Sequence, residues 1–145
     1  MHNTLTGDDF VSLFDLFKRK NKVVLSEEAL KWNKMWGLWA EERAESPYRE
    51  LMTYHSEINN GGHWQYFTNV ENVGNLQEEM SELEQILPAE LWSNVQKAYG
   101  AYLMLDEPAE SKTADKALDQ CDDIFYEKED EIINILKSYA AKLEL

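Results

Sequence analysis

The run Asn59-Asn60-Gly61-Gly62 lies inside a stretch of helical periodicity, and it constrains the fold more than any other part of the chain. Before it, the apolar and aromatic residues of the segment 51–58 recur at spacings of three and four, which align one helical face. Asn and Gly tolerate the left-handed conformation that closes a helix. We therefore predict that a helix opening at Ser46-Pro47 ends at this turn. Asn-Gly can also mark a β-hairpin, but the alternating strands that a hairpin needs are missing on both sides.

Polar side chains surround the predicted turn, and we expect them to lie close together. The aromatic run 64–67 that follows is predicted to form a short buried helix, so two helix ends meet here. Orphan backbone groups at helix ends need partners, which Asn, Gln and Glu side chains can supply. The alternative is a small-ligand pocket between the turn, Trp64, Tyr66 and Asp122 or Asp123. The predicted motif turn consists of Glu57, Asn59, Asn60, Gly61, Gly62, Gln65, Tyr66 and Phe67.

The sequence around the turn resembles a known family signature. Residues 57–67 read Glu-Ile-Asn-Asn-Gly-Gly-His-Trp-Gln-Tyr-Phe, which is similar to the E-x-N-N-G-G-x-x-Q-Y-F signature of a bacterial family of small acidic helical proteins. Residues 118–126 are similar to the family's later L-D-x-x-D-x-x-F-Y segment, and the resemblance covers roughly residues 48–143. The best-known member is a dimeric DNA-mimic protein that binds a transcription factor. The resemblance implies the fold, whereas function has to be argued from the sites.

The rest of the chain also shows helical periodicity, and we predict a single all-α domain over residues 1–145 with six to eight helices. The segment 1–45 carries no family signature and is expected to contain N-terminal helices, one with an apolar face at positions 10–17. Trp32, Trp36 and Trp39 share one face of a second helix that opens at Ser26. In the last helical region the apolar rhythm lapses near residues 126–130, which predicts a bend or an exposed stretch there.

The charge balance narrows the choice of partners. Asp and Glu number 28 against 14 Lys and Arg, which gives a formal net charge of −14. The excess is concentrated after residue 50, where nineteen acids accompany six bases. Such a field repels nucleic acid and attracts basic proteins, so we expect a basic protein partner and no direct nucleic-acid binding.

Carboxylates recur every four residues from Asp115 to Glu131. On a helix this spacing sets neighbours roughly 6 Å apart along the axis, and a second row beside the first would imitate the charge density of a phosphate backbone. The competing interpretation is a solvated face that confers solubility. The predicted partner-binding surface comprises Asp115, Asp119, Asp122, Asp123, Glu127, Asp130 and Glu131, extended by a second cluster at Glu78, Glu79 and Glu82.

The sequence contains no motif that points to catalysis, and we predict that the protein is not an enzyme. A Walker loop, a dinucleotide-binding glycine fingerprint and a nucleophile elbow are all missing. Cys121, the single cysteine, is expected on an apolar helix face beside two aspartates, which raise the pKa of a thiol. His55, Glu57 and His63 lack the His-Glu-x-x-His spacing of a zinc site, so we expect neither a metal nor a cofactor.

These observations together predict a non-enzymatic acidic binding protein of the cytoplasm. A single cysteine, the lack of an apolar run of about 18 residues and the lack of a signal peptide favour that location, without membrane contact. The resemblance implies a DNA mimic that occupies the basic DNA-binding surface of a partner such as a transcription regulator. A homodimer also fits the apolar face at 10–17 and the dimeric family member. Two alternatives stay open: a small-molecule-binding or catalytic helical domain that uses the turn, and an immunity-type protein that neutralises a basic toxin.

Overall fold

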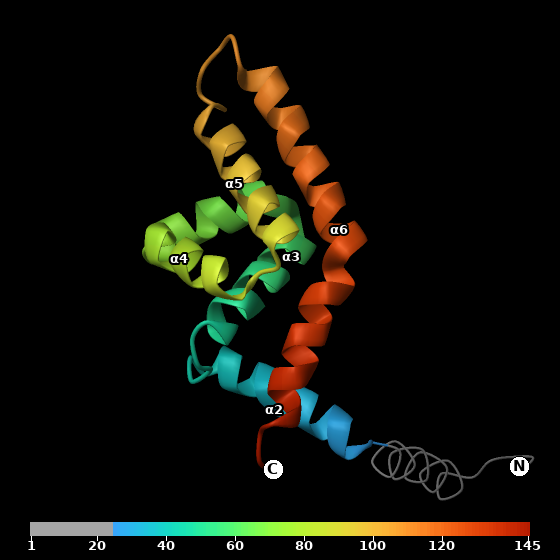
Figure 1. Ribbon diagram of the computed structural model, residues 1–145. Helices are drawn as coiled ribbons and strands as arrows, with labels where there is room; N and C mark the ends of the chain where they lie inside the picture. The colour runs from blue at the N-terminus through green and yellow to red at the C-terminus, as the bar shows by residue number, and fades with distance from the viewer. Residues whose placement is uncertain (1–24) are drawn as a thin grey trace, which may run out of the picture.

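The computed structural model describes residues 25–145, and all regular structure in that range is α-helical (Figure 1). This confirms the predicted all-α class for these residues. The helices pack around one hydrophobic core. In chain order they are α2 (Glu27–Ala40), α3 (Tyr48–Val73), α4 (Leu76–Ile86), α5 (Ala89–Leu103) and α6 (Ser111–Ala141).

The five helices in the described part of the chain are fewer than the predicted six to eight, so that prediction was wrong for these residues. The main reason is that the two helices predicted on either side of the Asn-Asn-Gly-Gly run follow one another directly across a kink and are counted as one element, α3. Within α3 only Gly61 and Gly62 leave helical geometry, and the chain changes direction there without a loop. The helix predicted around positions 10–17 lies outside the described residues.

Local sequence signals set the helix boundaries. Ser26 caps α2, because its hydroxyl accepts a hydrogen bond of 3.0 Å from the backbone N–H of Ala29. Asn75 caps α4 in the same way, through a bond of 3.2 Å from the N–H of Glu78. Each such cap stabilises a helix by about 1 kcal/mol. Pro88 stands immediately before α5, where its missing N–H costs nothing.

The longest helix, α6, organises the packing. It contacts α5, α3 and α2, whereas α4 packs against α3. In Figure 1, α5 and α6 run antiparallel side by side, and α2 crosses the C-terminal end of α6. The helix is unbroken through residues 126–130, and Tyr126, Glu127 and Asp130 are exposed, so the lapse in the apolar rhythm marks an exposed stretch and not a break. The largest fully buried side chains on α3 and α6 are Tyr54, Tyr66, Phe67, Phe125, Ile132 and Leu136.

The tryptophan stripe of α2 faces the core, as its spacing predicts. The rings of Trp36 and Trp39 meet edge to face with centroids 5.2 Å apart. Trp39 donates a hydrogen bond of 2.9 Å from its indole N–H to Thr53 Oγ1 on α3. The stripe therefore fixes α2 against α3. No helix among residues 25–145 is both long enough and apolar enough to span a membrane.

Candidate functional site

The two segments that carry the family resemblance meet where α6 packs against the break in α3. Asp122 Oδ1 accepts a hydrogen bond of 2.8 Å from the backbone N–H of His63 and lies 2.7 Å from His63 Nδ1. Four residues further along α6, the Tyr126 hydroxyl donates a bond of 3.0 Å to the carbonyl of Ile58. Residues 118–126 of α6, the later motif segment, therefore pack against the turn and hold both helix ends at the break.

A buried chain of hydrogen bonds continues from this contact into the core. His63 is fully buried, and its Nε2 lies 2.7 Å from the hydroxyl of Tyr54, which is also fully buried. A neutral imidazole that carries its proton on Nδ1 donates to Asp122 and accepts from Tyr54, so every group in the chain is satisfied. Burial raises the pKa of Tyr54 well above its ordinary value, which keeps the phenol protonated as this arrangement requires.

The remaining polar residues of the motif turn connect the two halves of α3 to each other and to α6, mostly through hydrogen bonds between side chains. Glu57 accepts bonds from Gln65 Nε2 at 3.1 Å and from Asn69 Nδ2 at 2.7 Å. Asn59 Nδ2 donates to the His55 carbonyl at 2.9 Å and to Glu129 Oε2 at 2.9 Å. The predicted structural role of these side chains agrees with this geometry, but only Asn59 bonds to a backbone group of the helix end.

The space beside the turn is filled by protein. Gly62 is buried, and a Cβ built on it would lie 2.4 Å from Asp122 Oδ2. Tyr66 is fully buried, whereas Trp64 points outward with 54% of its surface exposed. Asp122 therefore fills the space between Gly62 and α6.

The exposed face of α6 carries the predicted row of carboxylates. Between residues 119 and 131 the chain has seven acids and one base, Lys128. That lysine is shared, at 2.7 Å from Glu90 on α5 and 3.8 Å from Glu131. Asp122 is not part of the solvent-facing row, because its carboxylate bonds to His63. The exposed members are Asp115, Asp119, Asp123, Glu127, Asp130 and Glu131, and we call them the α6 acidic row.

The predicted second cluster lies in a different place. Glu78, Glu79 and Glu82 are on α4, which packs against α3, and they line a cavity of about 210 Å³ there. The other side chains that line this cavity are Ser46, Arg49, Glu50 and Ser81. The α4 carboxylates thus form a separate acidic site at the α3–α4 contact.

Glu50 is the residue at this contact that the sequence analysis missed. It is only 2% exposed, although it lies in the first turn of α3 beside Arg49. Arg49 Nη2 and Ser46 Oγ both donate to Glu50 Oε2, at 2.9 Å each. Three buried oxygens nearby have no hydrogen-bond partner: Glu50 Oε1, Glu79 Oε1 and the Tyr66 hydroxyl. Burial, and then the charge of Glu50, raise the pKa of Glu79 above its ordinary value of 4.5.

Replacing Glu79 with glutamine should therefore stabilise the protein at neutral pH. The raised pKa means that the wild-type carboxyl favours the folded state at low pH, and that this contribution is lost as the pH rises from 4.5 through the raised value. Glutamine does not titrate, and its amide can donate to Glu50, which is worth about 1 kcal/mol. Urea unfolding at pH 4 and pH 7 should show a gain that grows with pH. An equal gain at both pH values would contradict the assignment to this carboxyl.

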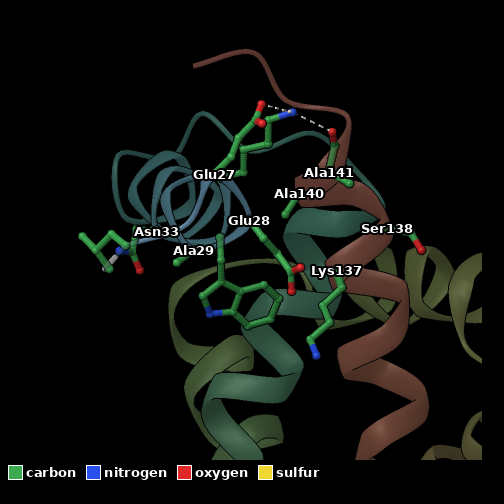
Figure 2. A pocket seen from close by; sticks show the side chains of 11 residues that line it. Glu27, Glu28, Ala29, Asn33, Lys137, Ser138, Ala140 and Ala141 are labelled. Carbon is green, nitrogen blue, oxygen red and sulfur yellow. Dashed lines mark hydrogen bonds and ion pairs between the residues drawn. The ribbon is translucent and has the colours of Figure 1, made fainter. Parts of the chain in front are cut away.

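A cavity of about 800 Å³ lies between the start of α2 and the end of α6 (Figure 2). More of its surface is apolar than polar, and Leu25, Trp32 and Ala140 are among the residues that line it. Lys31 also lines the cavity, and its Nζ donates a hydrogen bond of 3.0 Å to the Ala141 carbonyl and lies 3.6 Å from Glu27 Oε1.

In residues 25–145 no group of three His, Cys, Asp or Glu side chains is arranged to hold a metal ion. Burial, and then Asp122, raise the pKa of the buried Cys121 thiol, in the predicted direction.

Comparison with known proteins identifies a family. The family model described as DMP19-like protein matches residues 50–143. That range contains the motif turn, its Asp122 anchor and the α6 acidic row. Searches of curated proteins and of solved structures gave no match.

Proposed function

We propose that this chain, which belongs to the DMP19-like protein family, is a DNA mimic that occupies the basic DNA-binding surface of a protein partner. The family is one of DNA-mimic proteins, and the sequence has the strongly acidic charge that such a role needs. The observation that carries the proposal is the α6 acidic row, which is exposed along one side of a 31-residue helix. The proposal involves no catalytic step.

The spacing of the row suits a surface that normally binds phosphates. Carboxylates four residues apart stand roughly 6 Å apart along a helix, and the row from Asp115 to Glu131 extends over roughly 24 Å. One strand of a duplex carries a phosphate every ~3.4 Å of axis. The carboxylates of the row are therefore spaced more widely than the phosphates of one DNA strand and do not match them one to one. The row acts instead as an extended negative field that attracts a basic surface.

The core holds the row in place before any partner binds. The face of α6 opposite the row is anchored by buried residues, among them Leu118, Phe125 and Ile132. The Asp122–His63 contact fixes the middle of the helix against α3. A preorganised row avoids the entropy cost of ordering charges on binding, so more of the electrostatic attraction appears as affinity.

Reversing three charges of the row should abolish partner capture. In the triple variant Asp119→Lys, Asp123→Lys and Glu127→Lys, the field changes sign at the centre of the row, and we expect at least a tenfold loss of captured protein. The measurement is a pull-down from native lysate with the immobilised protein, eluted by stepwise salt and followed by mass spectrometry. Duplex DNA added to the column should release the captured proteins, because both compete for the same basic surface.

The matched control is a triple variant with the same change in net charge elsewhere. Glu28, Glu84 and Glu107 are exposed and lie outside the row, so their replacement by lysine should leave capture within twofold of wild type. Equal capture by the row variant, or captured proteins that DNA does not release, would contradict DNA mimicry. A basic toxin that is captured and not released by DNA would instead support the immunity-type alternative.

A further inference from the structure

The small cavity at the α3–α4 contact has a strong excess of negative charge. Of the residues that line its 210 Å³, four are glutamates and one is an arginine. Arg49 already neutralises part of this charge through its bonds to Glu50 Oε2. Arg49 also lies close enough to Glu79 and Glu82 for their charges to interact, but it is a single cation beside four carboxylates. The carboxylates that line the cavity therefore outnumber the positive charges that the protein places there.

Buried oxygens add a second and independent feature. Glu50 is 2% exposed, and its Oε1 has no partner although Oε2 has three donors. Glu79 Oε1 is buried and unpartnered as well, as is the hydroxyl of Tyr66, which lies nearby but outside the cavity lining. Both carboxylates lie close enough to the Tyr66 phenol to raise its pKa, after burial, which has the larger effect. A buried oxygen without a hydrogen-bond partner is unfavourable, so a ligand with several donors is favoured here.

We propose that this cavity binds a guanidinium group, supplied by an arginine side chain of the basic partner. A guanidinium is planar and carries five N–H donors, which suits several acceptors that converge from different directions. The cavity is smaller than the roughly 300–1,000 Å³ of pockets for drug-sized ligands, and its volume suits the head group of one side chain. The geometry does not favour a hard metal ion, because the carboxylates of the described residues do not form a three-ligand cluster.

The proposal rests on the proposed function only for the origin of the arginine. The cavity and its carboxylates lie on α3 and α4, away from the α6 acidic row. A partner that covers both would be held by the general field of the row and by one inserted side chain. Desolvated arginines in such pockets contribute disproportionately to binding energy at protein interfaces.

The test is a titration of the ¹⁵N-labelled protein with acetyl-arginine-amide, followed by amide chemical shifts at constant ionic strength. We expect saturable shifts confined to residues 46–50 and 78–82. Glu79→Gln, which should fold at least as stably as wild type, should weaken binding about tenfold through loss of one charged acceptor. Glu84→Gln, on the same helix but outside the cavity lining, should bind like wild type. Shifts that do not saturate, or that are equal in Glu79→Gln, would overturn the proposal.

A second titration with spermidine separates the two sources of organic cation. Saturable binding of spermidine in the cavity without binding of acetyl-arginine-amide would overturn the assignment to a partner's arginine. Because neither titration contains a partner protein, a positive result stands even if charge reversal of the α6 acidic row leaves capture intact. A negative result likewise leaves the proposed function untouched.

Discussion

Replacing Gly62 with alanine is expected to lower the free energy of unfolding by about 3–5 kcal/mol. Gly62 has φ 79° and ψ −175°, a conformation that is essentially restricted to glycine. Forcing alanine into it costs of order 1–3 kcal/mol. The new Cβ would also lie 2.4 Å from Asp122 Oδ2 and 3.0 Å from its Cγ, so the Asp122 carboxylate has to move.

That movement would break the contact between α6 and the turn. Asp122 Oδ1 accepts from both the backbone and the ring of His63, and His63 is fully buried. Donors left unpaired in the core cost about 1–3 kcal/mol each, which accounts for the second part of the expected loss. The measurement is urea unfolding followed by helical circular dichroism. Unchanged m-values would show that the folded and unfolded states keep their compactness.

Gly37→Ala provides the control for this substitution. Gly37 is exposed in the middle of α2, and a Cβ added there meets nothing within 4 Å. Alanine should therefore stabilise the helix by about 0.5–1 kcal/mol, the usual advantage over glycine in a helix interior. A loss of less than 1 kcal/mol in Gly62→Ala, beside a normal gain in Gly37→Ala, would mean that the turn can relax around a side chain.

The sequence locates the turn, but it does not decide whether Asp122 anchors the turn, lines a pocket beside it or belongs to the exposed acidic surface. Asn-Asn-Gly-Gly predicts a break in a helix, because the local chemistry of glycine and asparagine decides it. The anchor of that break, Asp122, lies about 60 residues further along the chain. Because it follows Asp119 by three and stands next to Asp123, it is grouped with the acidic surface of α6. One signal does distinguish it: Asp122 follows Leu118 by four and precedes Phe125 by three, so it borders the apolar face of α6.

Glu50 and Glu79 show a different limit of sequence analysis. Glu50 stands in the first turn of α3 next to Arg49, where an acidic residue is ordinarily exposed and favourable to the helix dipole. The burial of Glu50 depends on the angle at which α4 packs against α3, and the residue pattern of neither helix determines that angle. The α6 acidic row, by contrast, follows from a single helix with one apolar face, so its exposed members could be predicted from spacing alone.

The last prediction compares two adjacent aspartates that the sequence assigns to the same surface. Asp122→Ala should lower the free energy of unfolding by about 2–5 kcal/mol, because two buried donor groups of His63 lose their acceptor. Asp123 is exposed, so Asp123→Ala should change stability by less than about 0.5 kcal/mol. Urea unfolding of both variants beside wild type measures the difference directly.

Partner capture should show the opposite order. Asp123 belongs to the α6 acidic row, and its removal should weaken salt-sensitive capture, whereas Asp122 directs its carboxylate at His63 and adds little to the outer field. Below the temperature at which Asp122→Ala unfolds, that variant should therefore capture the partner almost as well as wild type. If Asp122→Ala remained as stable as wild type and yet lost capture, Asp122 would be a contact residue, and the role of the later motif segment would have to be reassigned from holding the turn to binding the partner.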